Sequence, residues 1–276
     1  MTRNFDAKVV AGFGDEWSRF DQSALADVEA QSLFHEYFDI FPWDDLPPNA
    51  IGFDAGCGSG RWARLVAPRV GRLYCFDASE AAVAVAKRNL ALHANCEVTV
   101  AAVDAMPIVD GSADFGYSLG VLHHVPDTAA ALRDCARKLR FGAPFLVYLY
   151  YRFDNRPVWY RALWSLTNSV RWVLSRSPYP VRYAVSQLFA AAVYWPLSRL
   201  ARWVEKAGLT PDSWPLAYYR NRSFYVMRTD ALDRFGTRLE QRFTREEIET
   251  MMCDAGLEKV IFSPHAPFWC AVGWKA

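Results

Sequence analysis

Short apolar runs and helical stretches alternate along the chain between residues 50 and 150. The spacing predicts helices over 61–66, 81–92 and 129–139, with Ser79 as N-cap of the second and Asp127 or Thr128 as N-cap of the third. The apolar runs, which we expect to be strands, are 51–54, 73–76, 98–103, 113–119 and 144–150. Such alternation predicts parallel β-α-β units with helices on both faces of one sheet.

The same rhythm returns near the C-terminus. Thr244 and Glu247 have the spacing of a capping box, which predicts a helix ending near Gly256, and apolar runs at 260–262 and 268–272 follow. Residues 1–48 instead predict one short amphipathic helix, on the apolar residues between 34 and 41, before prolines end it. We therefore expect an α/β core of residues 49–150 and 243–276, preceded by a helical segment, 1–48.

Residues 151–242 interrupt this core. Their apolar residues recur at helical spacing and predict two or three inserted amphipathic helices. The segment holds fifteen Lys and Arg against six acids, a net charge of +9, which leaves −8 for the rest of the chain. Six of the eleven tryptophans also lie here. Because the whole chain carries only +1, its composition argues against a protein that coats nucleic acid.

The strongest functional signal is a glycine-rich turn directly after the first predicted strand. The sequence from Asp54 to Gly60, D-A-G-C-G-S-G, lets the backbone approach a ligand beside the free N–H groups of the next helix. Arg61 stands where a dinucleotide-binding motif has its last glycine, and the sequence has no GK[ST]. These departures disfavour a diphosphate ligand; a turn without any ligand is the alternative.

Acids follow the second and third predicted strands. Asp77, with Ala78 after it, lies about twenty residues beyond Gly56, where an acid can accept hydrogen bonds from both hydroxyls of a ribose. Asp104 and Ala105 are placed to reach an adenine amine and to cover its ring. Each acid also has a structural alternative, a helix cap for Asp77 and a turn for Asp104.

In combination these residues resemble the motifs of class I S-adenosylmethionine-dependent methyltransferases, among them those that act on small molecules and sugars. The resemblance rests on the glycine turn, Asp77, Asp104 and the sequence 113–127, and it extends over about half of the chain. It implies an α/β, doubly wound, Rossmann-like sheet of seven strands with the last one antiparallel. The implied cofactor, S-adenosyl-L-methionine, would lie across the carboxyl ends of the first strands.

The resemblance also implies which residues hold the cofactor. The turn would bind the methionine portion and the ribose, Asp77 the ribose hydroxyls, Asp104 and Ala105 the adenine, and Leu119 would lie under the methionine end. The segment 13–20 is similar to N-terminal segments that cover the cofactor in some sugar and natural-product methyltransferases. The expected cofactor residues are Asp54, Ala55, Gly56, Gly58, Gly60, Asp77, Ala78, Asp104, Ala105, Leu119 and Trp17.

Methyl transfer from a sulfonium needs no metal, and the six cysteines have neither zinc-site nor disulfide spacing. If the acceptor is a hydroxyl, a general base must take its proton, and a neutral histidine suits that role near pH 7. His123 and His124 follow the fourth predicted strand, so we expect at least one of them to line the site. His265, near the last predicted hairpin, is a further candidate. For each histidine a purely structural role is the alternative.

Three interpretations of the insertion remain open. It is a solvated basic face over a Trp-rich core, a pocket for an anionic or glycosyl acceptor, or an interfacial surface that reaches a lipid-linked acceptor at the membrane. Of the two functional interpretations, the acceptor pocket is slightly favoured over the interfacial surface. The expected acceptor residues there are Tyr218, Tyr219, Arg220, Arg222 and Tyr225.

The expected activity is therefore methylation of a hydroxyl on a small molecule, sugar intermediate or glycan. A nucleic-acid methyltransferase is less favoured, since the fourth strand ends in Leu119-Gly120-Val121 and not in [DN]-P-P-[FY]. A non-catalytic cofactor-binding partner protein is the other alternative. The N-terminus has no apolar signal sequence, and the longest uncharged stretch, 183–198, is too short to span a bilayer, so we expect a cytoplasmic protein.

Overall fold

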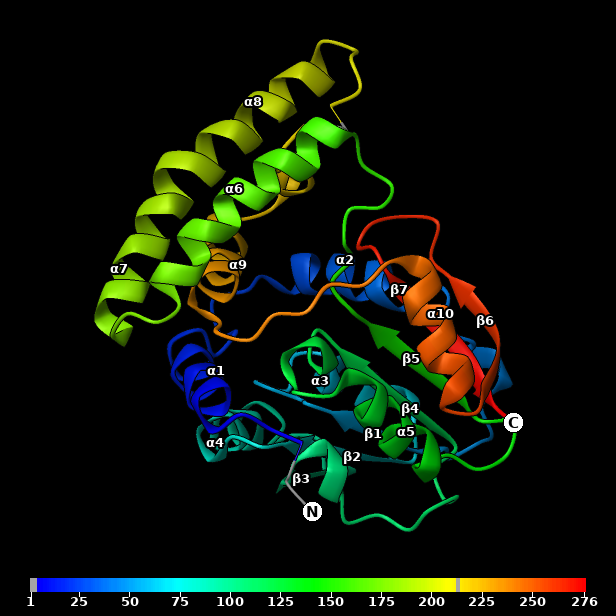
Figure 1. The fold of residues 1–276 in the computed structure, drawn as a ribbon. Coiled ribbons are helices and arrows are strands. Elements are labelled where there is room, and N and C mark those ends of the chain that lie inside the picture. The colour runs from blue at the N-terminus through cyan, green and yellow to red at the C-terminus, as the bar shows by residue number, and fades with distance from the viewer. Residues whose placement is uncertain (1–3, 212–213) are drawn as a thin grey trace. The chain divides into compact units, whose positions relative to one another are not determined.

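A mixed sheet of seven strands, in the order β3-β2-β1-β4-β5-β7-β6, is the centre of the fold in the computed structural model, which describes residues 4–211 and 214–276 (Figure 1). Strands β1 to β5 pair in parallel, whereas β7 runs antiparallel to both β5 and β6. The predicted Rossmann-like sheet with an antiparallel last strand is thus confirmed. The strands are β1 (Ile51–Ala55), β2 (Arg72–Asp77), β3 (Cys96–Val100), β4 (Phe115–Leu119), β5 (Pro144–Tyr148), β6 (Leu257–Phe262) and β7 (Cys270–Lys275).

The helices of this α/β core begin where the sequence places their caps. Ser79 accepts the N–H of Ala82, and Asp127 accepts that of Ala130. Thr244 and Glu247 form the predicted capping box. These caps satisfy N–H groups that a helix start leaves without partners. The core helices are α1 (Ala7–Arg19), α2 (Asp27–Phe38), α3 (Ala63–Val66), α4 (Glu80–Asn89), α5 (Thr128–Lys138) and α10 (Arg245–Asp254).

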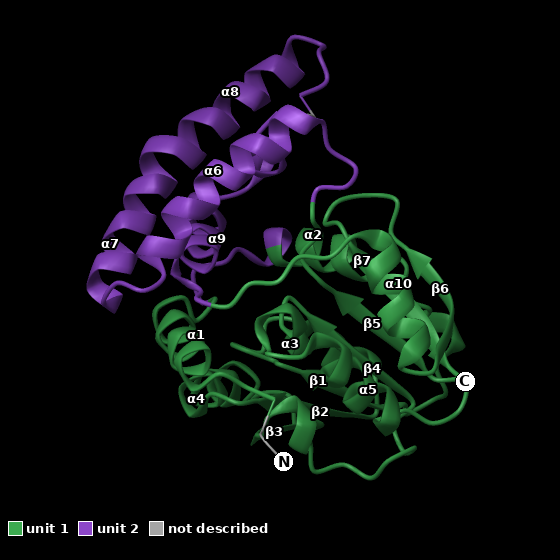
Figure 2. Cartoon of the chain, viewed as in Figure 1, with its two compact units in different colours: residues 1–22, 30–152, 239–276 green, residues 23–29, 153–238 purple. Residues whose placement is uncertain are grey.

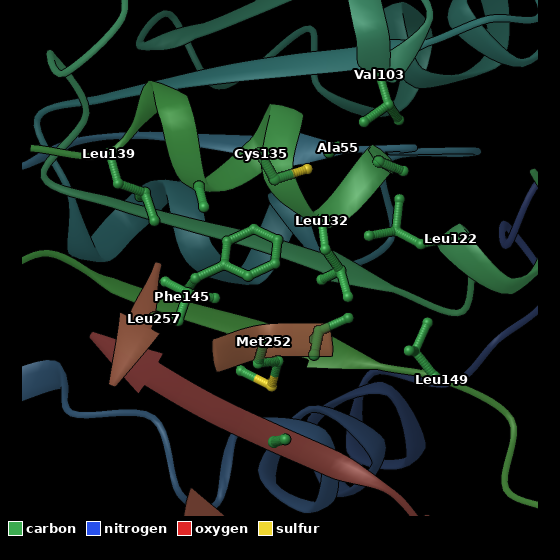
Figure 3. Close-up of a cluster of buried hydrophobic side chains, with 14 of the residues drawn as sticks. Ala55, Val103, Leu122, Leu132, Cys135, Leu139, Phe145, Leu149, Met252 and Leu257 are labelled. Atoms are coloured by element: carbon green, nitrogen blue, oxygen red, sulfur yellow. The ribbon is translucent and has the colours of Figure 1, made fainter. Parts of the chain in front are cut away.

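Alternate residues of the strands are buried on opposite faces of the sheet. On one face, Phe145 packs with side chains of α5 and α10, among them Leu132 and Met252 (Figure 3). On the other face, Phe38 of α2 lies edge-on to Tyr117, with 5.3 Å between ring centroids. Both faces are therefore covered, as expected for a parallel sheet.

The observed secondary structure departs from the prediction in several places, two of them in the N-terminal segment and at the end of β3. Residues 4–48 contain two long helices, α1 and α2, where one was expected, because Gly12 and Gly14 obscure the helical pattern of α1. Strand β3 ends at Val100, three residues earlier than predicted. It pairs only with β2. Because the last residue of β2, Asp77, is opposite Val100, the residues after Val100 have no strand to pair with.

The chain forms two compact units, each described by itself here (Figure 2). Unit 1 comprises residues 1–22, 30–152 and 239–276 and contains the sheet; unit 2 comprises 23–29 and 153–238. Unit 2 lies inside the predicted insertion 151–242, apart from its first segment, where Glu29 accepts the N–H of Ser223.

Four α-helices, not two or three, occur in the part of unit 2 that the structure describes. They are α6 (Val158–Leu174), α7 (Tyr179–Phe189), α8 (Trp195–Lys206) and α9 (Phe224–Gly236), and a π-helical turn, Ala190–Tyr194, joins α7 to α8. Met227, Ala231 and Phe235 of α9 form the interior of the unit together with Leu174 and Tyr194. Polar residues at 223 and 228–230 hid the fourth helix from the apolar pattern.

Candidate cofactor and acceptor site

The turn after β1 is fixed to the end of β2. The N–H groups of Gly56 and Cys57 both donate to the carbonyl oxygen of Phe76, at 2.7 and 2.8 Å. Gly56 and Gly58 have positive φ, and a Cβ atom would lie 2.4 Å from the Val121 side chain at Gly56 and 2.8 Å from the Trp17 indole at Gly58. Both positions therefore need glycine for conformation and for space.

Asp77 holds this turn from the end of β2. Its Oδ2 accepts the N–H of Gly58 at 2.9 Å, and its Oδ1 accepts the N–H of Ser79 at 2.8 Å. Burial raises the pKa of Asp77, although the two backbone donors counteract part of that rise. The cap of α4 is Ser79, so Asp77 is not needed for that role. Each carboxylate oxygen keeps a second acceptor position, which suits a pair of ribose hydroxyls.

Asp54, at the end of β1, is buried with an incomplete set of partners. Its Oδ2 has no hydrogen-bond partner within the described part of the chain. Burial raises the pKa of Asp54 to about 8; the adjacent Tyr117 hydroxyl lowers it in part, and the negative charge of Asp77 adds to the rise. A buried carboxyl that lacks a donor favours a cationic ligand, such as the ammonium group of a bound amino acid.

Asp104 lies in the 3-10 turn Val103–Ala105, not at a strand end as predicted, because β3 is shorter. Its Oδ2 accepts the backbone N–H of Asn4 at 2.7 Å, while Oδ1 is buried and has no partner among residues 4–211 and 214–276. Asn4 also exchanges two hydrogen bonds with the backbone of Asp127. One acceptor atom of Asp104 thus remains for a ligand amine, as the adenine assignment requires.

Helix α1 covers the glycine turn. The Trp17 indole lies against Gly58, and the guanidinium of Arg61 stacks over Trp17 at 5.7 Å and over Trp62 at 4.4 Å. A Cβ at Gly14 would lie 2.7 Å from Ser79 Oγ, which shows how closely α1 approaches the start of α4. This arrangement fits the expectation that the segment 13–20 shields the cofactor.

The two histidines lie in the 3-10 turn Leu122–His124, which follows the buried Leu119. His124 Nδ1 is 2.7 Å from the carbonyl oxygen of Leu239. A carbonyl only accepts, so Nδ1 carries the proton and the neutral ring has its basic lone pair on Nε2. The ring of Phe13 on α1 is 4.9 Å away.

His123 has a different environment. Its ring is fully buried and stacks on Tyr150 at 3.8 Å, and neither ring nitrogen has a hydrogen-bond partner in the described chain. Burial, together with the nearby His124 and Arg242, lowers the pKa of His123 well below 6.5, so it is uncharged at neutral pH. Of the two candidates, His124 is the one that is oriented by a defined hydrogen bond.

The predicted acceptor residues of unit 2 gather around the 3-10 turn Ala217–Asn221, where they also contact one another. Arg222 lies over the Tyr218 ring at 5.0 Å, and Arg220 pairs with Glu205 at 2.8 Å. Burial raises the pKa of Tyr219 well above 10, and Asp230 adds to that rise. Tyr225 follows at the start of α9. His265 belongs to unit 1, where it is exposed in the loop before β7 and its N–H donates to Ser263.

Sequence reasoning missed several residues of this site. Tyr117 is opposite Asp54 in the register of β1 and β4, a pairing that alternation along two neighbouring strands could have revealed. Asn4 and the carbonyl of Leu239 come from segments distant in sequence from the turns that they contact. A single sequence carries no local signal for such contacts.

The site residues coincide with a known family domain. Residues 53–147 match the family described as "Methyltransferase domain", which covers β1 to β5 with the glycine turn and both histidines. Residues 53–147 thus match a methyltransferase domain. Its cofactor is S-adenosyl-L-methionine, and the buried acceptors of Asp54 and Asp104, with the glycine turn between β1 and α3, fit that molecule's amino group, adenine and amino-acid portion.

Relatives of this methyltransferase domain align over less than half of the chain. An uncharacterised protein encoded in transposon TN4556 of Streptomyces fradiae is 35% identical over 46% of this chain and 37% of its own length. A Mycobacterium tuberculosis protein, named as a probable S-adenosylmethionine-dependent methyltransferase, is 34% identical over 46% of each. The ubiquinone biosynthesis O-methyltransferase of Alkalilimnicola ehrlichii is 35% identical over 46% of this chain and 56% of its own. The chain therefore spans about half or less of the first relatives.

A solved structure supports the fold. A chain in the Haloferax volcanii complex of the Trm112 methyltransferase activator superposes with a TM-score of 0.51 over 99% of each chain, at 16% sequence identity. At that identity the likeness concerns the fold alone. The methyltransferase-domain match itself concerns residues 53–147.

Proposed function

We propose that the whole chain is an O-methyltransferase that uses S-adenosyl-L-methionine to methylate a hydroxyl of a small molecule, sugar intermediate or glycan, including an acceptor carried on a lipid. The observation that carries this proposal is the bond between His124 Nδ1 and the carbonyl oxygen of Leu239, which makes Nε2 the basic nitrogen of the neutral ring. The name of the Alkalilimnicola relative, an O-methyltransferase, agrees with oxygen as the attacking atom.

In this mechanism the cofactor supplies an electrophilic methyl group, and the protein supplies position and a proton acceptor. Asp77 and the glycine turn would hold the ribose and the amino-acid portion, Asp54 the ammonium, and Asp104 the adenine. His124 would take the proton of the acceptor hydroxyl on Nε2 as the oxygen attacks, while the carbonyl of Leu239 stabilises the imidazolium through Nδ1. Alignment of the nucleophile accounts for most of the remaining acceleration.

The insertion would provide the acceptor contacts. Arg222, Tyr218 and Tyr225 offer a guanidinium and phenol rings, which recognise anionic and glycosyl groups. Arg220 is already paired with Glu205, which balances its positive charge. It would therefore help to position the acceptor more than to attract an anionic group.

The test measures S-adenosylhomocysteine formation with a panel of phenols, nucleotide sugars, polyprenyl-linked sugars and RNA. We expect turnover with a hydroxyl-bearing small molecule or glycan, and a methyl ether by mass spectrometry. Turnover only with RNA, or a methyl group on nitrogen or carbon, would overturn the proposal. Cofactor binding without turnover on any acceptor, even at high pH, would favour the non-catalytic alternative.

A further inference from the structure

Unit 2 exposes much apolar surface that its own fold does not cover. Of the 24 large apolar side chains that are exposed in the described chain, 17 lie between residues 153 and 238, a segment of under a third of the sequence. Scattered exposed apolar residues are ordinary, whereas a concentration of them marks a surface that meets another phase or another molecule.

Five exposed apolar residues of α6 form a continuous line. Trp159, Leu163, Leu166, Val170 and Val173 recur at alternating steps of four and three residues, which places them on one side of the helix. Trp159 is 52% exposed and Leu166 is 68% exposed. Arg171 and Leu174 near the end of the same helix are buried.

A second line follows α7 and α8. Val181, Ala184 and Leu188 are exposed on α7, and Leu200 and Trp203 on α8, where Trp203 is 75% exposed. The π-helical turn Ala190–Tyr194 lies between α7 and α8. It changes the rotation about the helix axis of the α8 side chains relative to those of α7. We call the two lines on α6 and on α7–α8 the apolar stripes.

The charged residues between positions 155 and 204, the stretch that contains both stripes, have one sign. Residues 155–204 contain seven arginines, no lysine, and neither Asp nor Glu. Arg176 stacks on Trp172 at 4.2 Å and donates to the Trp172 carbonyl, and Arg199 stacks on Trp195 at 4.1 Å and donates to the carbonyls of residues 220 and 222. Carbonyl partners orient these guanidinium groups without neutralising them, so the surface stays both apolar and cationic.

We propose that the apolar stripes bind the surface of a bilayer that contains anionic phospholipid. Trp and Arg are the side chains that the headgroup region favours, and the positive charge complements anionic lipid. A second copy of the chain is a poorer occupant, because it would bring the same positive charge against itself. Within residues 4–211 and 214–276, no helix combines the length and apolarity needed to cross a membrane. The proposal does not depend on which acceptor is methylated.

Vesicle flotation with the full chain tests this binding. We expect the chain to float with vesicles of phosphatidylcholine and phosphatidylglycerol in equal parts, and about tenfold less with phosphatidylcholine alone. Added salt should weaken the binding. The double variant Leu166→Gln, Trp203→Gln and the double variant Arg161→Gln, Arg202→Gln should each lose about tenfold in affinity for the anionic vesicles.

Matched controls lie in unit 1. Leu92 is 96% exposed, and Arg88 is exposed and bonded only within its own helix, so Leu92→Gln and Arg88→Gln should leave flotation unchanged. Unchanged binding of S-adenosylhomocysteine shows that each variant is folded. The proposal is overturned by absent flotation with anionic vesicles, by flotation that the stripe variants do not weaken, or by equal loss in the controls. A dimer in sedimentation that Leu166→Gln, Trp203→Gln dissociates, without vesicle binding, would assign the stripes to self-association.

Discussion

Units 1 and 2 differ in how their polar groups are used. Around the glycine turn of unit 1, carboxylates are buried and some of their oxygens lack partners among the described residues, whereas in unit 2 Arg176 and Arg199 donate to backbone carbonyls and many large apolar side chains are exposed. Buried carboxylate oxygens with an incomplete set of hydrogen bonds point to a small ligand that carries hydrogen-bond donors and a positive charge. An exposed, cationic and apolar surface points to an extended partner. Changes in one unit should therefore leave the property of the other unit intact.

The largest expected effect is on turnover in unit 1. His124→Ala removes the proposed base and should lower turnover by about 10²–10⁴-fold, since that is the usual contribution of general base catalysis. Affinity for S-adenosylhomocysteine and vesicle flotation should not change. Steady-state kinetics with the acceptor found in the panel measures this, with His93→Ala, in the loop between α4 and β3, as control. Parental turnover in His124→Ala would remove the base from the mechanism.

Asp77→Ala should follow, with a loss of about 10²-fold or more in cofactor affinity. The variant deletes the acceptor of two ribose hydroxyls and also frees the N–H groups of Gly58 and Ser79. Isothermal titration with S-adenosylhomocysteine gives the affinity, and Asp110→Ala, an exposed carboxylate paired with Lys138, is the matched control. Equal losses in both variants would argue against a ribose role.

Asp54 predicts a pH dependence. Its pKa is about 8 in the folded chain against 3.8 in the unfolded chain, so the folded state keeps a proton that the unfolded state has released, and stability of the unbound chain falls as pH rises from about 4 to about 8. Asp54→Asn should flatten that fall and raise stability near pH 8 by up to about 6 kcal/mol, because the pKa differs by about four units and each unit corresponds to about 1.4 kcal/mol.

The same group makes cofactor binding depend on pH. A bound ammonium favours the ionised carboxylate, so affinity for S-adenosylhomocysteine should rise by up to about tenfold per pH unit below 8, with release of a proton. Chemical denaturation and titration at several pH values measure the two effects. Parental pH profiles in Asp54→Asn would show that another group titrates.

The smallest effect concerns the contact between α1 and the turn. Gly58→Ala should cost about 1–2 kcal/mol in stability, because φ is positive there and the added methyl meets the Trp17 indole. The double variant Gly58→Ala, Trp17→Ala should recover the part of the stability loss that comes from the clash with Trp17. The part that comes from the positive φ should remain. Gly142→Ala, also at positive φ but with open space around it, gives the backbone part alone. Equal cost in Gly58→Ala and Gly142→Ala would mean that Trp17 does not press on the turn.

The sequence predicted the sheet well because its signals are local. Apolar runs, the glycine turn, Ser79 and the Thr244–Glu247 capping box act over a few residues. The caps were found where expected, and the seven strands overlap the predicted apolar runs, although several strand ends differ by two or three residues. The end of β3 depended on where its partner strand stops, and the bonds of Asn4 and Leu239 depend on contacts over a hundred residues apart. Those features arise from tertiary packing, which a single sequence does not encode locally.

Calorimetric titration of the unaltered chain with S-adenosyl-L-methionine and S-adenosylhomocysteine tests the central claim most directly, that the edge of the sheet around Asp54, Asp77 and the glycine turn binds this nucleoside. We predict saturable heat with one site per chain for both molecules, and none for NAD. Absence of heat with both sulfur nucleosides, for a chain shown to be folded, would contradict the account.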